Sequence, residues 1–169
     1  MEKMGERRRR WPSAVILLAG MSLAGGWREA SAAQLVKPAS LSVPNPSRLL
    51  ILVRSTMIAL NQANITGNYT VLADLGSAKF RRDNPPAKLA ATFEAFRKAK
   101  VDISAVALVT PQVTKPPVIG ADQQLVIDGA FPTSPMRVKY LLQFEMAEGK
   151  WLLSGLNLGL EKFDPSQGN

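Results

Sequence analysis

Apolar side chains recur every three to four residues between residues 48 and 62, the spacing of an amphipathic helix. The stripe consists of Leu49, Leu52, Val53, Thr56, Met57 and Leu60. Asn45 followed by Pro46 favours a helix start just before it, because asparagine caps free amide groups and proline tolerates the first helical position. The pattern therefore predicts a helix over about 48–62.

Two shorter helices are predicted next. One covers 68–75, with Thr66 as its cap and Gly76 as a left-handed stop. A basic loop is expected over 79–84. The sequence Asn84-Pro85-Pro86 is then a helix start, followed by the apolar positions Leu89, Ala90, Phe93 and Phe96 at helical spacing.

Beyond Val101 the apolar period changes from about 3.6 to 2, which predicts strands. The predicted strands are 106–110, 124–131, 138–146 and 150–160, with a breaker at 114–117 and a hairpin loop at 147–149. Helices come first and antiparallel strands follow. The fold class is therefore α+β.

The N-terminus has the order of regions found in secretory signal peptides. Four consecutive arginines, Arg7 to Arg10, precede an apolar run over 14–23, and Ala30-Ser31-Ala32 supplies small residues for cleavage. The run is shorter than the roughly 20 residues of a spanning helix, which favours cleavage over the alternative of an uncleaved anchor. We expect a signal peptide at 1–32, an extended linker at 33–46, a domain at 47–162 and a flexible tail at 163–169. The localisation predicted is periplasmic or secreted, with no membrane span after cleavage.

The composition excludes several kinds of catalytic and structural site. The 169 residues carry a net charge of +8 and contain no cysteine and no histidine. Removing 1–32 takes away six basic and three acidic residues, so 15 minus 10 leaves +5. Disulfides, thiolate sites and mechanisms based on Ser-His-Asp or Cys-His are excluded. No catalytic residue, metal site or cofactor is predicted, and export argues against nucleic acid as a partner.

The segment 61–72, Asn-Gln-Ala-Asn-Ile-Thr-Gly-Asn-Tyr-Thr-Val-Leu, resembles a segment of small exported bacterial proteins of unknown function. Phe131-Pro132-Thr133 followed by 138–151 is similar to their closing hairpin. Together with the helix order, these segments resemble the nuclear transport factor 2-like (cystatin-like) superfamily over about 47–160. The resemblance implies N-terminal helices packed on a curved, cone-shaped antiparallel sheet. Some members of that superfamily are isomerases, cyclases or dehydratases and others only bind, and no motif carries a catalytic residue over to this chain.

Four residues are candidates for a ligand site. Tyr69, Tyr140 and Trp151 could line a pocket, although core packing is the favoured explanation, because a small α+β domain needs aromatic residues in its core. Asp128 could act as a proton shuttle on the same strand face as Asp122, whereas Asp128-Gly129 also reads as a turn or bulge. A further basic group, Lys79, Arg81, Arg82 and Lys88, is expected to remain solvated.

The favoured hypothesis is an exported, non-catalytic binding or interaction module of the bacterial cell envelope. Its expected partners are a small apolar ligand or an envelope protein. The alternative is an aspartate-based isomerase or lyase that acts on an apolar small molecule in the cone pocket. A third hypothesis is an adaptor that forms a homodimer through its sheet.

Overall fold

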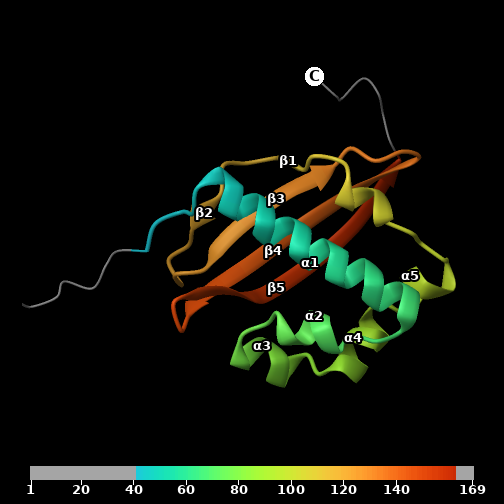
Figure 1. Cartoon of the computed structure of the whole chain (residues 1–169), viewed down its shortest axis with the longest axis horizontal. Coiled ribbons are helices and arrows are strands. Elements are labelled where there is room, and N and C mark those ends of the chain that lie inside the picture. The colour runs from blue at the N-terminus through green and yellow to red at the C-terminus, as the bar shows by residue number, and fades with distance from the viewer. Residues whose placement is uncertain (1–40, 163–169) are drawn as a thin grey trace, which may run out of the picture. The chain divides into compact units, whose positions relative to one another are not determined.

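The computed structural model describes residues 41–162, and it has the α+β order expected from the sequence. Helices come first and a five-stranded antiparallel sheet follows (Figure 1). The expected signal peptide at 1–32, most of the linker and the tail at 163–169 lie outside the described residues. Within 41–162, no helix combines the length and the hydropathy needed to cross a membrane.

The long helix α1 (Pro46–Thr66) begins as the sequence predicts. The Asn45 side chain accepts a hydrogen bond from the Arg48 amide at 2.9 Å. The helix runs four residues beyond Gln62, because its stop is Gly67, which adopts the left-handed conformation with a φ of 75°. Thr66 is thus the last residue of α1 and does not cap the next helix.

The second predicted helix is shorter than expected, and its glycine has another role. Helix α2 (Thr70–Asp74) ends without a left-handed residue, so the prediction for Gly76 is wrong. Gly76 instead forms an isolated parallel bridge with Leu153 of the last strand. A side chain would not fit there, since a Cβ on Gly76 would lie 2.2 Å from Cδ1 of Phe80.

The expected basic loop is a helix, α3 (Ala78–Asp83). Ser77 starts it, because its Oγ accepts a hydrogen bond from the Phe80 amide at 3.2 Å. The third predicted helix is two helices, α4 (Pro86–Thr92) and α5 (Glu94–Lys98), which are separated at Phe93.

The predicted strand at 106–110 is wrong. The structure has a 3-10 helix, η1 (Ser104–Ala107), in its place. Asp102 starts this turn by accepting hydrogen bonds from the Ser104 amide and hydroxyl. Asn61 of α1 holds the same segment, since its Oδ1 accepts from the Ile103 amide at 3.0 Å. These polar contacts, one of them from a residue 42 positions away, override the alternation of apolar residues.

The sheet contains β1 (Gln112–Val113), β2 (Val118–Ile119), β3 (Leu125–Phe131), β4 (Met136–Ala147) and β5 (Lys150–Lys162). The order is β1-β3-β4-β5, and β2 also pairs with β3. The three predicted strands at 124–131, 138–146 and 150–160 are confirmed. Glu148 and Gly149 form the hairpin turn with φ values of 52° and 71°, the positive values that a tight two-residue turn requires.

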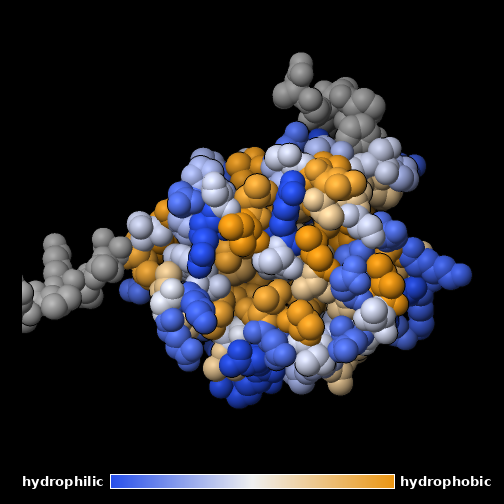
Figure 2. Space-filling model, viewed as in Figure 1, coloured by the Kyte–Doolittle hydropathy of each residue, from blue (hydrophilic) through white to orange (hydrophobic). Residues whose placement is uncertain are grey.

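The core lies between the helices and one face of the sheet. Leu52, Met57 and Leu60 of α1 are buried together with alternate residues of β3 and β4. α1 crosses the sheet in Figure 1, and Figure 2 shows hydrophobic patches on this same side of the molecule. The sheet is not strongly curled, so the pronounced cone expected from the resemblance is not seen.

Candidate functional site

A pocket of about 390 Å³ lies between the short helices α3 and α4 and the strand β5. Its lining contains apolar and neutral polar side chains from three separate parts of the chain. The lining residues are Phe80, Asn84, Leu89, Thr92, Phe93, Leu141, Gln143, Ser154, Gly155, Leu156 and Asn157. Its volume lies in the range of pockets that hold ligands, roughly 300–1,000 Å³.

The pocket exists because residues 75–77 attach to the edge of β5. The Leu153 amide donates a hydrogen bond to the Leu75 carbonyl at 3.0 Å, and the Ser77 amide donates to the Leu153 carbonyl at 2.9 Å. Ser77 then starts α3 and directs Phe80 into the core, where it is buried. The helices consequently stand beside β5 and enclose the pocket next to residues 154–157.

The strand β5 is the last strand of the sheet, and residues 151–160 contain no charged side chain. Four consecutive residues of this edge, 154–157, line the pocket. Ser154 lies at a register shift between β4 and β5, and its hydroxyl donates to Oε1 of Gln124 at 2.8 Å. Edge strands expose backbone amides and carbonyls that can pair with another chain. The pocket therefore presents backbone as well as side-chain groups.

The lining combines an apolar floor with neutral amides. Phe80, Leu89 and Phe93 are buried and form the floor. The side chains of Gln143 and Asn157 also line the pocket and supply neutral amides, which can form hydrogen bonds with a ligand. No ionisable side chain occurs among the lining residues that the structure describes. The site can bind by hydrogen bonding and burial, but it offers no group of its own for proton transfer.

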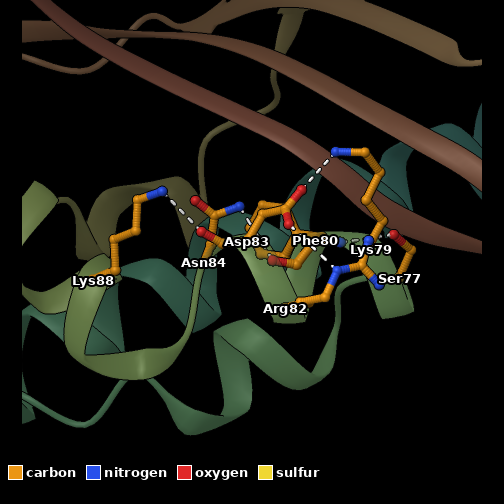
Figure 3. A network of polar contacts seen from close by, with 7 residues as sticks. All are labelled: Ser77, Lys79, Phe80, Arg82, Asp83, Asn84 and Lys88. Carbon is orange, nitrogen blue, oxygen red and sulfur yellow. Dashed lines mark hydrogen bonds and ion pairs between the residues drawn. The ribbon is translucent and has the colours of Figure 1, made fainter.

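A basic cluster lies beside this pocket, on α3 and the start of α4 (Figure 3). Oδ2 of Asp83 accepts a hydrogen bond from the Lys79 ammonium at 2.5 Å, and Oδ1 of Asp83 lies 3.6 Å from Nε of Arg82. Lys88 donates to the backbone carbonyl of Asp83 at 2.8 Å. The hydrogen bond from Lys79 and the nearby positive charges hold the pKa of Asp83 below its ordinary value. With one acidic residue among several exposed cations, the cluster stays positive.

Tyr69, one of the four candidate residues, is part of the core. Its hydroxyl donates to Oδ1 of Asn64 at 2.6 Å and accepts a hydrogen bond from Arg97 at 2.7 Å. Its ring stacks on Phe93 with centroids 6.1 Å apart. The polar tip of Tyr69 is thus engaged by neighbouring residues of the fold.

Tyr140 and Asp128 line a second, shallow groove of about 440 Å³ over β4 and β5. Asp128 lies opposite Leu141 in the middle of β3, so the turn predicted at Asp128-Gly129 is wrong. Gly129 is needed because a Cβ there would lie 2.5 Å from the Tyr140 hydroxyl. Burial raises the pKa of Tyr140 to about 12, and the charge of Asp128 adds to the increase.

Trp151 is half-buried and pairs with Met146 near the hairpin turn. It does not line the groove of Tyr140 and Asp128, and neither does Tyr69. Asp122, in contrast, has the turn role expected of it, because its side chain accepts from the Gln124 amide at 3.2 Å. The structure therefore brings two of the four candidates together and leaves the other two elsewhere.

The pocket beside β5 was not among the sequence predictions. Leu89 and Phe93 of its floor were predicted as the apolar face of a helix, whereas Phe80 fell within the predicted basic loop. The edge of the pocket was predicted as an ordinary strand. The one available signal is the uncharged run at 151–160, which is unusual for an edge strand because exposed edges commonly carry charges. This signal can be recognised only once β5 is known to be the edge strand of the sheet.

Comparison with known proteins gives no family, because no protein-family model, curated protein or solved structure matches the chain. The α+β order and the antiparallel sheet agree with the class of fold that the sequence resemblance implies. Among residues 41–162, no group of three or more acidic, histidine or cysteine side chains is arranged to hold a metal ion.

Proposed function

We propose that this protein is an exported, non-catalytic binding module that holds an extended peptide segment of an envelope partner against the edge of β5. The observation that carries the proposal is the uncharged edge at 154–157, which opens onto a pocket with an apolar floor and neutral polar side chains around it. Added strands gain affinity from backbone hydrogen bonds and specificity from pockets that receive alternate side chains. The pocket floor of Phe80, Leu89 and Phe93 is suited to one apolar side chain.

The fold already uses this edge for strand addition. Residues 75–77 bind Leu153 by two backbone hydrogen bonds in a parallel bridge. The same edge continues past this bridge through residues 154–157 along the pocket. A peptide that pairs there extends an arrangement that the chain itself begins. Such pairing also covers an edge that would otherwise favour aggregation.

The charges near the pocket indicate which peptide fits best. Lys79, Arg82 and Lys88 surround Asp83 on the neighbouring helices (Figure 3). A positive surface speeds association with acidic partners and disfavours basic ones. The preferred segment therefore has an apolar residue for the floor and acidic residues next to it.

Export and superfamily membership belong to the same proposal. The arginine, apolar and small-residue regions of 1–32 support export, and the resemblance of 61–72 and 131–151 supports a nuclear transport factor 2-like fold. Mass analysis of protein extracted from an exporting host tests the first point. A mature N-terminus near Ala33 is expected, and an intact Met1 chain in the cytosol contradicts export.

A second candidate function is the aspartate-based isomerase or lyase. One observation favours it, namely that half-buried Asp128 lines a groove whose lining also includes Tyr140. The high pKa of Tyr140 keeps its phenol protonated at neutral pH, so the base would be a carboxylate of the groove. Asp128 is the half-buried one, whereas Glu161 of the same lining is exposed. This function predicts turnover that depends on Asp128.

A random decapeptide library displayed on phage tests the peptide proposal. The matched variants are Thr92→Trp, which fills the pocket, and Thr110→Trp, which places the same side chain at an exposed position outside the pocket lining. We expect a peptide selected on the native protein to bind Thr92→Trp at least tenfold more weakly and Thr110→Trp normally. Thermal midpoints show that both variants are folded. Failure to enrich any peptide, or equal binding to both variants, overturns the proposal.

A further inference from the structure

The outward face of α1 carries apolar side chains where a surface helix ordinarily carries charges. Ile51, Ile58 and Ile65 are 59%, 39% and 60% exposed. The opposite face of the helix is also apolar and is buried in the core. α1 thus has two apolar faces, and the fold covers only one of them.

The three isoleucines form a straight stripe. They are spaced seven residues apart, which is close to two helical turns, so they lie one above another. Ser55 and Gln62, also seven residues apart, lie beside the stripe and are uncharged. From Ser55 to Ala73 the sequence contains no charged residue.

A groove of about 500 Å³ adjoins this stripe between α1 and α2. Its lining is mostly apolar and includes Ile58, Ala59, Val71 and Leu75. Figure 2 shows hydrophobic patches on the α1 side of the molecule. The stripe and the groove together make a ridge with a furrow beside it, the shape by which two helices pack.

From this geometry we infer that α1 is a homodimer interface, in which two copies of the chain pack their α1 helices antiparallel about a twofold axis at Ile58. The sequence spacing is self-complementary, because Ile58 is midway between Ile51 and Ile65. A twofold axis at Ile58 places Ile51 of each copy opposite Ile65 of the other. This reciprocal pairing is what a symmetric dimer interface requires.

The stripe contains no charged side chain, so a second copy of the chain can pack against it. A twofold axis brings each residue near its own counterpart, so charges close to the axis would repel each other. Arg54, the nearest charged residue before the axis, is directed elsewhere, since it donates hydrogen bonds to the carbonyls of Ala107 and Val109. The stripe of one copy therefore packs against the stripe of the other without bringing like charges together.

The size of the surface predicts a reversible dimer. The stripe from Ile51 to Ile65 is about 21 Å long at ~1.5 Å per residue, and a helix with its side chains is about 10–12 Å wide. With the groove included, each copy covers on the order of 400 Å², or about 800 Å² for the pair, which is below the size of stable interfaces and within the range of weak, transient ones. We therefore expect a dissociation constant on the order of micromolar. This dimer differs from one formed through the sheet and is independent of peptide binding at β5.

Sedimentation velocity of the processed protein at increasing concentration tests the interface. The native chain is expected to shift from monomer to dimer over the micromolar range. Ile58→Glu places two carboxylates at the axis and should raise the dissociation constant at least tenfold. The control is Leu108→Glu at a position that is 87% exposed and outside the stripe, and it should dimerise normally. A monomer at all concentrations, or a dimer unaffected by Ile58→Glu, overturns the inference.

Two further experiments test the position of the axis and the antiparallel arrangement. The chain has no cysteine, so Ile58→Cys introduces a single thiol. Oxidation should give a disulfide-linked dimer much faster for Ile58→Cys than for Leu108→Cys at the same concentration, because only the first thiol lies at the axis of a preformed dimer. Combining Ile51→Glu with Ile65→Lys should restore the dimer that Ile51→Glu alone weakens. Failure of the charge pair to restore it, with both variants folded, contradicts the antiparallel register.

Discussion

The Tyr69 hydroxyl donates a hydrogen bond of 2.6 Å to Oδ1 of Asn64, which ties the end of α1 to the start of α2. Arg97 completes the arrangement from α5 by donating to the same hydroxyl at 2.7 Å and to the Ala90 carbonyl at 2.6 Å. Its guanidinium also lies 5.4 Å from the centre of the Tyr69 ring. The hydroxyl is therefore a junction that holds three helices together.

Removing this hydroxyl should destabilise the fold. Tyr69→Phe leaves the buried Asn64 oxygen without its donor, which costs about 1–3 kcal/mol of unfolding free energy. Tyr140→Phe is the matched control, because within the described residues the Tyr140 hydroxyl is buried without a partner. That variant should be as stable as the native protein or more so. Urea denaturation measures both, and equal losses would contradict the distinction.

The ionisation of Tyr140 predicts that the stability of the fold depends on pH. Its pKa of about 12 in the folded protein exceeds the ordinary value of 10.0, chiefly because of burial. Folding thus favours the neutral phenol, so this contribution to stability is complete below pH 10 and is lost as the pH rises toward 12. The ultraviolet absorbance of tyrosinate should show a late titration step that Tyr140→Phe removes. A native protein that titrates fully at the ordinary pKa would show that the phenol is solvated.

The hairpin of β4 and β5 should contribute unequally along its length. Phe144 is buried in the core, so Phe144→Ala should cost roughly 3–5 kcal/mol. Trp151 is half-buried near the turn, so Trp151→Ala should cost clearly less. Denaturant midpoints compare the two variants. A larger loss for Trp151→Ala would place the main core contact at the turn.

The sequence predicts the elements whose own pattern is long. The alternation over 138–146 and the stripe over 48–62 each repeat several times, and both elements are found. Short elements depend on distant partners. The segment at 106–110 alternates like a strand, but Asn61 and Asp102 hold the residues before it in a 3-10 turn.

The candidate site was harder to predict for the same reason. Its pocket combines Phe80 and Leu89 with Gly155, residues far apart in the chain. The contact that assembles it is the bridge between Gly76 and Leu153, and glycine appeared in the sequence only as a helix stop. Tyr69 and Trp151 were reasonable candidates by residue type. Their location depends on packing that residue type does not specify.

The final prediction separates a binding module from an enzyme, and it concerns Asp128. With no histidine or cysteine in the chain, catalysis in this groove would need a carboxylate base. Asp128 is the stronger candidate, because it is half-buried and Glu161 of the same lining is exposed. We expect Asp128→Asn to keep peptide binding unchanged and to alter stability by less than about 0.5 kcal/mol, as for most substitutions away from the core. Asp122→Asn is the control, since asparagine can still accept from the Gln124 amide. The native protein is screened for turnover of small carbonyl compounds, and any turnover found is then measured for both variants. A turnover that disappears with Asp128→Asn while Asp122→Asn retains it would show that the protein is an enzyme.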